Sequence, residues 1–426
     1  MKKNTQLNQW LWKWHIVGGL ISLPFMLLLA VTGVIYLFKA DVNQHLYEDT
    51  MFVEVPSASS QPISYASQLT SAQNAGQGEV VGMTVSAKQN RATEFKIKGQ
   101  GRATNVLYVN PHNGEITGKI EQKETFMYLV RKLHGEILLN KVGTLAVELI
   151  ASWFIVLILT GLYIWWPKQG SGAAGFFTIR TTKGRRIFWR DMHAVTGFWL
   201  SAFMLAVVAG GMPWTDVFGS NLKWVQKQTN SGYPQNWQNA KGLESVFIQT
   251  NITQTSIQSL DLDKVISIAE TYQLPGTLSI NLPVSKKGVY TIKNRALWLE
   301  DQQVIHIDQY SGNVVAVYNW NDVGILMETR QIFMRFHQGE YGLVNWLVML
   351  GVGLAFIVMT SAGLTSYLMR KSKGNWSIPQ VPPRFNVDKT LILMIIVLGL
   401  LFPMFGGSLV LLWLWDKRHN FMKKVF

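Results

Sequence analysis

Four histidines stand in matched sequence surroundings, and such histidines are candidate ligands for a metal or a haem. His15 opens the apolar run WHIVGGLISLPFMLLLAVTGVIYLF, and His193 opens MHAVTGFWLSAFMLAVVAGGMPW. With these two in register, glycines follow both histidines at the same distances: Gly19 and Gly197 four residues on, and Gly33 and Gly211 eighteen residues on.

A second pair of histidines repeats this behaviour. His134 opens LHGEILLNKVGTLAVELIASWFIVLILTGLYIWWP, and His337 opens FHQGEYGLVNWLVMLGVGLAFIVMTSAGLTSYLMRK. A glycine follows 27 residues after the first and 26 after the second, at Gly161 and Gly363. The chain is therefore predicted to contain one arrangement twice, with each of the four histidines at the start of a membrane helix.

The composition is that of a membrane protein with sizeable aqueous parts, since 48% of the residues are hydrophobic and only 15% are charged. A helix needs about 20 apolar residues to cross a bilayer. Five stretches meet this length: 15–38, 142–166, 193–214, 342–368 and 390–415. The first is too long for the apolar part of a cleavable signal peptide. The absence of cysteine excludes disulfides, iron–sulfur clusters and covalently attached haem.

The net charge of +14 comes largely from the segments between these stretches. Cations precede the first stretch, fill the loop 167–192 and follow the fourth stretch. This is the positive-inside pattern, so we expect a cytoplasmic N-terminus and no binding of nucleic acid. Segments 39–141 and 215–341 then lie on the outer side. The stretch 390–415, after a linker at 369–389 and before a basic tail at 416–426, is either a fifth span or a re-entrant element broken near Pro403, which leaves the side of the C-terminus open.

Both outer segments are predicted to be small α+β domains. LYVNPHNGEITGKI and IHIDQYSGNVVAVY each show alternating apolar residues around a glycine-bearing turn, which is typical of a β-hairpin. The fold class expected is a mainly α-helical membrane protein with two tandem parallel repeats of helix, outer α+β domain and helix, plus a C-terminal hydrophobic helix. His112 and His306 fall in the hairpins at unmatched positions, and we interpret them as surface or structural histidines.

This topology sorts the four histidines into two pairs. His15 and His193 fall on the cytoplasmic side, and His134 and His337 fall on the outer side. Two imidazoles that face each other are the axial ligands of a b-type haem, so we expect two b-type haems, with these four histidines as the iron ligands. Zinc is the alternative metal, but it takes three or four protein ligands.

Small and basic residues near the histidines suit a haem. Gly19 and Gly197 lie one turn past their histidines, where a flat macrocycle needs bare backbone. Cations that can hold the haem propionates lie beside the ligands: Lys132, Arg131 and Arg335 on the outer side, and Arg190 and Lys13 on the inner side. The positions of these cations are explained equally well by an interfacial role, in which a long basic side chain extends from the membrane helix to the water interface.

At this point the chain resembles a known family, the PepSY-associated transmembrane family. The resemblance rests on the WxH start, LHG…G…TG…WWP, R…H…G, FHxG…G…GL…R and the two outer hairpin motifs. It covers residues from about 10 to 375 and implies PepSY-like outer domains in a protein of the bacterial inner membrane. Members take part in siderophore and iron uptake, and some are haem-containing ferric-siderophore reductases. His15, His134, His193 and His337 match the histidine positions of the family.

The function expected is that of a transmembrane electron conduit with two haems, which reduces ferric iron on the outer side, with a ferric siderophore as the expected acceptor. The sequence does not contain an electron-donating domain of its own, since the chain has no GxGxxG fingerprint for a dinucleotide. We therefore expect a cytosolic flavoprotein or a membrane quinol as the electron donor. The alternative is a non-enzymatic, membrane-anchored PepSY-like protein that binds or takes up an iron complex. Intramembrane charges would favour transport, but the predicted spans contain almost none, and Glu148 is the clearest acidic residue within them.

Overall fold

The computed structural model describes residues 5–56, 61–86, 88–98, 104–166, 175–246, 259–372, 374–380 and 387–425. The chain forms two compact units. We call them the helical unit, made of 1–37, 130–225 and 330–426, and the sheet unit, made of 38–129 and 226–329. Four cations of the positive-inside pattern, Lys2, Lys3, Lys168 and Lys373, lie outside the described residues.

Among the described residues, four helices are long and apolar enough to cross a membrane: α1 (Thr5–Leu37), α6 (Asn140–Trp165), α7 (Arg185–Gly211, continued by the 3-10 turn η2, Met212–Trp214) and α11 (Gly342–Arg370). This confirms the first four predicted spans and the membrane character of the protein. Each helix packs against two others, because α1 contacts α6 and α11, and α7 also contacts α6 and α11. Apolar side chains fill the centre of this ring, among them Ile158, Met204 and Met359.

Two of these helices begin well before the predicted positions. The structure starts α1 at Thr5 and α7 at Arg185, so His15 lies about three turns and His193 about two turns inside its helix, and not at its start. The apolar window misses these first turns because they contain charged and aromatic residues. Such residues form helix as readily as apolar ones do, at the level where a membrane helix meets water.

The histidines of the second pair are not on membrane-spanning helices at all, which corrects the prediction. His134 belongs to the short helix α5 (Phe126–Glu136), and His337 ends α10 (Ile325–His337). The chain between α5 and α6 reverses through left-handed residues, with φ of 47° at Ile137 and 58° at Leu138. A Cβ atom at Gly143 would lie 1.5 Å from the Glu136 carbonyl oxygen, so this turn requires glycine there.

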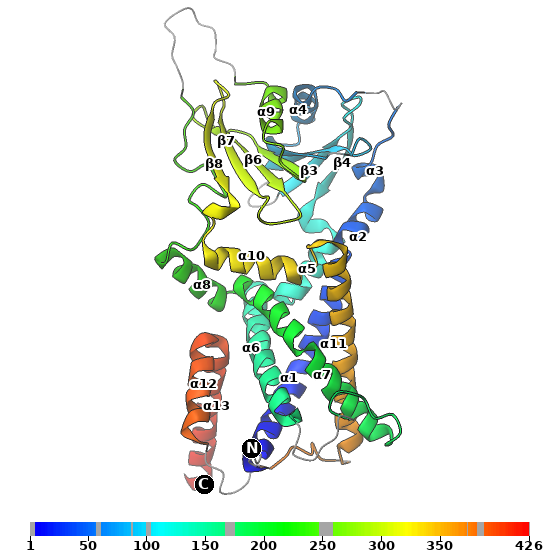
Figure 1. The fold of residues 1–426 in the computed structure, drawn as a ribbon, viewed down its shortest axis with the longest axis vertical. Helices are drawn as coiled ribbons and strands as arrows, with labels where there is room; N and C mark the ends of the chain where they lie inside the picture. The colour runs from blue at the N-terminus through cyan, green and yellow to red at the C-terminus, as the bar shows by residue number, and fades with distance from the viewer. Residues whose placement is uncertain are drawn as a thin grey trace, which may run out of the picture. The chain divides into compact units, whose positions relative to one another are not determined.

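The fifth hydrophobic stretch is a helical hairpin. Helix α12 (Lys389–Leu401) ends before Pro403, where α13 (Pro403–Val425) begins, and the two run side by side (Figure 1). Their backbones meet at two glycines, since a Cβ atom at Gly406 would lie 2.5 Å from the Gly399 carbonyl oxygen. The 13 residues of α12 span about 20 Å, which is less than the roughly 30 Å of a hydrocarbon core. The geometry therefore favours the re-entrant alternative over a fifth span.

The sheet unit contains one antiparallel sheet of eight strands, in the order β4-β3-β2-β1-β5-β6-β7-β8 (Figure 1). The first outer segment provides β1 (Glu79–Val85), β2 (Thr93–Lys98), β3 (Thr104–Val109) and β4 (Ile116–Glu121). The second provides β5 (Thr277–Asn281), β6 (Val289–Arg295), β7 (Gln303–Asp308) and β8 (Val314–Asn319). The two segments are joined where β1 pairs with β5, with Met83 opposite Ile280. The α+β domains expected separately thus share one sheet.

Two helices cover one face of this sheet, α4 (Tyr65–Asn74) and α9 (Leu262–Glu270). Their apolar sides meet alternate strand residues, which include Phe95, Ile292 and Ile305, all fully buried. Both predicted hairpins are confirmed as β3–β4 and β7–β8, with left-handed glycines at their turns. The remaining helices of the described residues are α2 (Lys39–Leu46), α3 (Glu48–Met51), α8 (Val217–Gln228) and the 3-10 turns η1 (Gln122–Glu124) and η3 (Trp320–Asp322).

Candidate functional site

The rings of His15 and His193 face each other across the helical unit. Their centres are 6.2 Å apart and their planes are inclined by 67°. An imidazole nitrogen binds a first-row metal ion at about 2 Å, so two rings on opposite sides of one ion have centres about 6 Å apart. The spacing of this pair is therefore the spacing of two axial ligands with an ion between them.

His134 and His337 form a second pair with nearly the same geometry. Their ring centres are 6.1 Å apart, and the planes are inclined by 63°. The fold thus brings together the histidines that the sequence had paired, although His134 and His337 come from α5 and α10 and not from the spanning helices. Each pair joins one histidine from the first half of the chain with one from the second half.

Hydrogen bonds define the tautomer of the two histidines from the second half. The Nδ1 atom of His193 lies 3.0 Å from the carbonyl oxygen of Met359, and that of His337 lies 2.8 Å from the carbonyl oxygen of Val207. A carbonyl oxygen can only accept, so Nδ1 carries the proton in both rings. The lone pair is then on Nε2, which is the state in which a histidine binds a metal.

The two histidines from the first half contact threonine hydroxyls instead. The Nδ1 atom of His15 is 3.0 Å from Thr160 Oγ1, and that of His134 is 3.1 Å from Thr32 Oγ1. Each hydroxyl donates its own proton to a main-chain carbonyl one turn back in its helix, that of Val156 or Leu28. It must therefore accept from Nδ1–H, which again leaves the Nε2 lone pair free.

Glycines provide the room for all four rings. A Cβ atom at Gly161 would lie 3.1 Å from Cε1 of His15, and one at Gly33 would lie 3.1 Å from Cε1 of His134. A Cβ atom at Gly363 would come within 2.7 Å of His193 Nδ1. At Gly211 the distance to Cε1 of His337 is 3.6 Å. The glycines in matched sequence positions are thus the ones against which the histidines pack.

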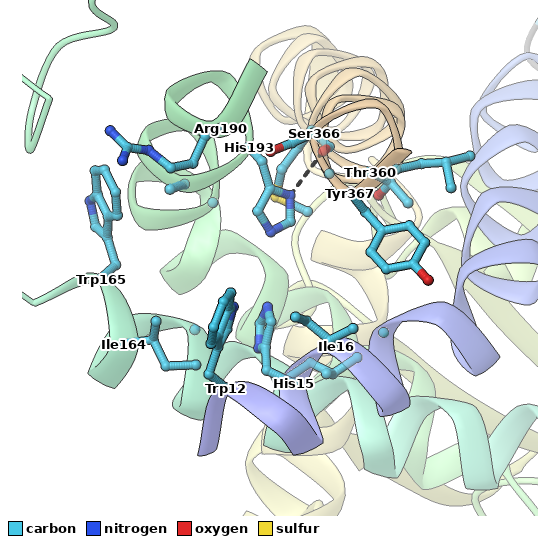
Figure 2. Close-up of a pocket in the computed structure, with 18 of the residues that line it drawn as sticks. Trp12, His15, Ile16, Ile164, Trp165, Arg190, His193, Thr360, Ser366 and Tyr367 are labelled. Carbon is cyan, nitrogen blue, oxygen red and sulfur yellow. Dashed lines mark hydrogen bonds between the residues drawn. The ribbon is translucent and has the colours of Figure 1, made fainter. Parts of the chain in front are cut away.

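A cavity of about 910 Å³ lies beside the His15–His193 pair, and its walls are mostly apolar (Figure 2). Gly19 and Gly197 both line it. A Cβ atom at Gly19 would meet nothing within 4 Å, and one at Gly197 would meet only the Met359 sulfur at 3.3 Å. Both glycines thus present bare backbone to a space of the size that a planar organic cofactor needs.

Five cations also line this cavity: Lys183 from the loop before α7, Arg185, Arg186 and Arg190 from α7, and Arg370 from α11. The predicted residue Arg190 is positioned by the buried carboxylate of Asp191, 2.8 Å from its Nη2 atom. Asp191 also accepts from Arg180, and this hydrogen bond raises the pKa of the Arg180 guanidinium above its ordinary value. Lys13, the other predicted cation, is not part of the lining.

The cations beside the second pair are engaged differently. Lys132 forms an ion pair with Glu136 on the same helix and donates to Asn140 Oδ1 at 3.1 Å. Arg335 is buried, with only 8% of its surface exposed, two residues before His337. Arg131 lies on α5 three residues before His134.

Three further histidines, His45, His112 and His306, are not part of either pair. His45 is exposed on α2, in the sheet unit. His112 contacts the carbonyl oxygen of Gln89, 3.1 Å from its Nε2 atom. His306 is fully buried, and both of its ring nitrogens are bonded, to Thr291 and to the Asn236 carbonyl. His306 therefore has a structural role.

The two pairs lie far apart along the spanning helices. Helix α1 contacts both pairs. It provides His15 to one pair, and its Gly33 packs against His134 of the other. Eighteen residues of helix separate His15 from Gly33, which is about 27 Å at 1.5 Å per residue. This distance is close to the thickness of a hydrocarbon core.

The family can now be stated on a direct comparison. The model of the family described as the PepSY-associated TM region matches residues 12–370. The chain belongs to the PepSY-associated transmembrane family. No curated protein matches the chain. The PepSY-associated match includes all four paired histidines and confirms the resemblance seen in the sequence motifs.

Two site residues of this PepSY-associated protein were missed by sequence reasoning, Thr32 and Thr160. A signal was present, because each stands directly before a matched glycine, Gly33 or Gly161, and the threonine and glycine contact the same histidine ring. Among the described residues, no group of three or more histidine, aspartate or glutamate side chains can hold a metal ion. Each pair offers two imidazole nitrogens as possible donors to a metal ion.

Proposed function

We propose that this protein is a transmembrane electron conduit that holds two b-type haems and reduces ferric iron bound to a siderophore. The observation that carries the proposal is the pair of facing imidazoles, repeated at two levels of the helical unit with centres 6.2 Å and 6.1 Å apart. Family membership supports it only broadly, since the match identifies the transmembrane region and not its chemistry.

The residues of the His15–His193 site fit a haem. The imidazoles offer Nε2 to both faces of an iron, and Gly19 and Gly197 border the space that a flat ring needs. Arg190 and Arg370 line the same cavity and suit the two propionates, because a guanidinium binds carboxylates with paired hydrogen bonds. When bound, an iron with both axial positions filled takes up and releases single electrons.

The His134–His337 site fits in the same way on narrower grounds. The four glycine-backed rings and their tautomers are equivalent in the two sites. Lys132, Arg131 and the buried Arg335 flank this pair and can hold its propionates. With about 27 Å of α1 between the sites, one haem serves each side of the bilayer.

We further propose that the chain is a tandem parallel repeat of a helix, an outer module and a helix. The register of the histidines and glycines supports this, and so does the sheet order, in which four strands from each half meet at β1 and β5. An axis along the membrane normal would then relate the halves and run between the members of each pair, which is where functional sites of such repeats lie.

The membrane is the bacterial inner membrane, with the N-terminus in the cytoplasm and the sheet unit outside. A cytosolic flavoprotein or a quinol would supply electrons to the site held by His15 and His193, and the site held by His134 and His337 would serve the iron complex outside. Reduction weakens the hold of hard oxygen donors on the iron, because affinity depends on the charge of the ion.

The test uses purified protein in sealed vesicles, with reductant inside and both a ferric siderophore and an impermeant ferrous chelator outside. We expect near two haems per chain in a pyridine haemochrome assay, and ferrous iron trapped outside. Variants that lack either haem should form no external ferrous iron. A folded wild-type protein without haem would leave a binding or uptake role as the explanation of the fold.

A further inference from the structure

We infer that each histidine pair is built from unlike ligands, and that Thr160 and Thr32 are positioning residues that tune one haem each. This inference rests on the proposed haem function. In each pair, the histidine from the first half is bonded through a threonine hydroxyl, and the histidine from the second half through a main-chain carbonyl.

The hydroxyls are fixed in their direction. Thr160 Oγ1 donates to the Val156 carbonyl oxygen at 2.8 Å, and Thr32 Oγ1 donates to the Leu28 carbonyl oxygen at 2.6 Å. A hydroxyl has one proton, so each oxygen has only its lone pairs left for the histidine. The result is a short chain of hydrogen bonds, from Nδ1–H to the hydroxyl to the carbonyl, in which each bond polarises the next.

The second half has no hydroxyl at these places. In the glycine register, Thr160 corresponds to Ala362 and Thr32 corresponds to Gly210. There the histidine reaches a carbonyl directly, that of Met359 for His193 and that of Val207 for His337. The same difference therefore occurs in both pairs. The type of acceptor depends on whether the histidine comes from the first or the second half of the chain, and not on which of the two pairs it belongs to.

This asymmetry has a chemical consequence. A hydrogen bond from Nδ1–H raises the basicity of the ligating nitrogen and holds the ring in place. A carbonyl acceptor belongs to the main chain and cannot be changed by substitution, whereas a hydroxyl acceptor can. The first-half ligands, His15 and His134, are thus the ones through which a side chain sets the affinity and the reduction potential of each haem.

The inference is tested with Thr160→Val, Thr32→Val and Thr160→Ser in the full-length protein. Valine keeps the shape and removes the hydroxyl, so Nδ1–H of His15 loses its acceptor and the imidazole becomes a weaker donor. We expect Thr160→Val to raise the midpoint potential of the His15–His193 haem and to lower its affinity about 10- to 100-fold, the usual effect of losing such a partner. Thr32→Val should do the same to the other haem, and Thr160→Ser should restore the wild-type potential.

The haem that is not targeted reports that each variant is folded, since its content and potential should stay at wild-type values. Thr144→Val is the matched control, because Thr144 lies on the same helix and donates to the Asn140 carbonyl at 3.1 Å without contacting a histidine. The Leu157 and Leu29 carbonyl oxygens lie 3.2 Å from Thr160 Oγ1 and Thr32 Oγ1 and are the other acceptors available to Nδ1–H of His15 and His134. If both valine variants keep wild-type potentials and affinities, these carbonyls hold the rings and the inference is wrong. A wild-type protein without haem would instead refute the proposed function.

Discussion

The carboxylate of Glu148, in the middle of a spanning helix, accepts a hydrogen bond from the main-chain N–H of Val217 at 2.8 Å. Its other oxygen accepts from the N–H of Phe218 at 2.9 Å, so this side chain caps the first turn of α8. Glu148 is fully buried. The clearest acidic residue of the predicted spans therefore has a structural role, as the cap of a helix.

Replacement of Glu148 by glutamine should destabilise the helical unit. The amide can accept from one N–H but presents its own N–H₂ to the other, and an unsatisfied buried donor costs about 1–3 kcal/mol. We expect a lower midpoint of thermal unfolding in detergent. The control is Asp216→Asn, since the exposed pair of Asp216 and Lys141, at 3.8 Å, is worth about 0–1 kcal/mol. Equal midpoints for the two variants would contradict the capping role.

Substitution of single histidines should remove haems by pairs. His15→Ala or His193→Ala should each leave one haem per chain, and His134→Ala or His337→Ala should leave the other, because an iron that has lost one axial ligand is held weakly. Haem content by the pyridine haemochrome assay measures this. The exposed residue His45 provides the control, and its alanine variant should keep both haems. A site emptied by His45→Ala but not by His134→Ala would refute the assignment of the second pair.

An added methyl group at Gly363 should disturb one histidine selectively. Its Cβ atom would lie 2.7 Å from His193 Nδ1 and push the ring away from the Met359 carbonyl. Overpacking of this kind costs about 1–3 kcal/mol, which corresponds to a loss of about 5- to 140-fold in affinity for the haem of that pair. Gly351→Ala on the same helix is the control, because a Cβ atom there meets nothing within 4 Å. Haem titration of the two variants should differ accordingly, and equal affinities would count against the close packing.

The β7–β8 turn should lose stability in acid through Asp308. Burial favours the neutral form of Asp308, but N–H groups of Ser311, Tyr310 and Val246 bond its carboxylate and hold the pKa below the ordinary value. The carboxylate thus stabilises the fold above the unfolded pKa of about 3.9, and this contribution is lost as the pH falls through the lower folded pKa.

We therefore expect Asp308→Asn to speed amide hydrogen exchange in β7 and β8 at neutral pH, with the difference from wild type shrinking below about pH 4. The comparison is Asn110→Asp at the equivalent turn, where Asn110 Oδ1 accepts from the His112 N–H at 2.9 Å, and its effect should be small. A difference for Asp308→Asn that stays constant from neutral to acid pH would exclude the carboxylate as its cause.

Both ends of the C-terminal hairpin should lie on one side of the membrane. The hairpin is anchored near its tip, where Ser408 accepts from Trp153 Nε1 at 3.1 Å and Phe405 packs on the same indole. The natural chain has no cysteine, so single cysteines at 389 and 417 can be labelled with an impermeant maleimide. Both should react from the side on which a cysteine at 185 reacts, and Glu115→Cys should react from the opposite side. Labelling of 389 and 417 from opposite sides would show a fifth span.

Much of the site could be predicted from the sequence because histidines and glycines recur in it at matched spacings. The register that aligns His15 with His193 also aligns Gly33 with Gly211. These two glycines pack against the rings of the other two histidines, His134 and His337. The break between α5 and α6 could not be predicted, because Ile137, Leu138 and Leu139 continue the apolar run while two of them adopt left-handed backbone. Tertiary packing overrides local preference there.

The threonine contacts and the joined sheet escaped prediction for a different reason. Threonine is unremarkable in a membrane helix, and its role depends on which ring the partner helix brings near. The β1–β5 pairing likewise depends on two strand edges from distant parts of the chain. Alternation shows which face of a strand is buried, but it does not show which edge finds a partner.

The pairing of β1 with β5 also dictates an order of events in biosynthesis. When the first four strands have been synthesised, β1 still presents an unpaired edge, and its partner begins only at Thr277. Unpaired edges invite association with other chains. The nascent protein must therefore keep this edge protected while α6 and α7 are inserted, and a chain truncated before β5 would leave the edge exposed to association with other chains.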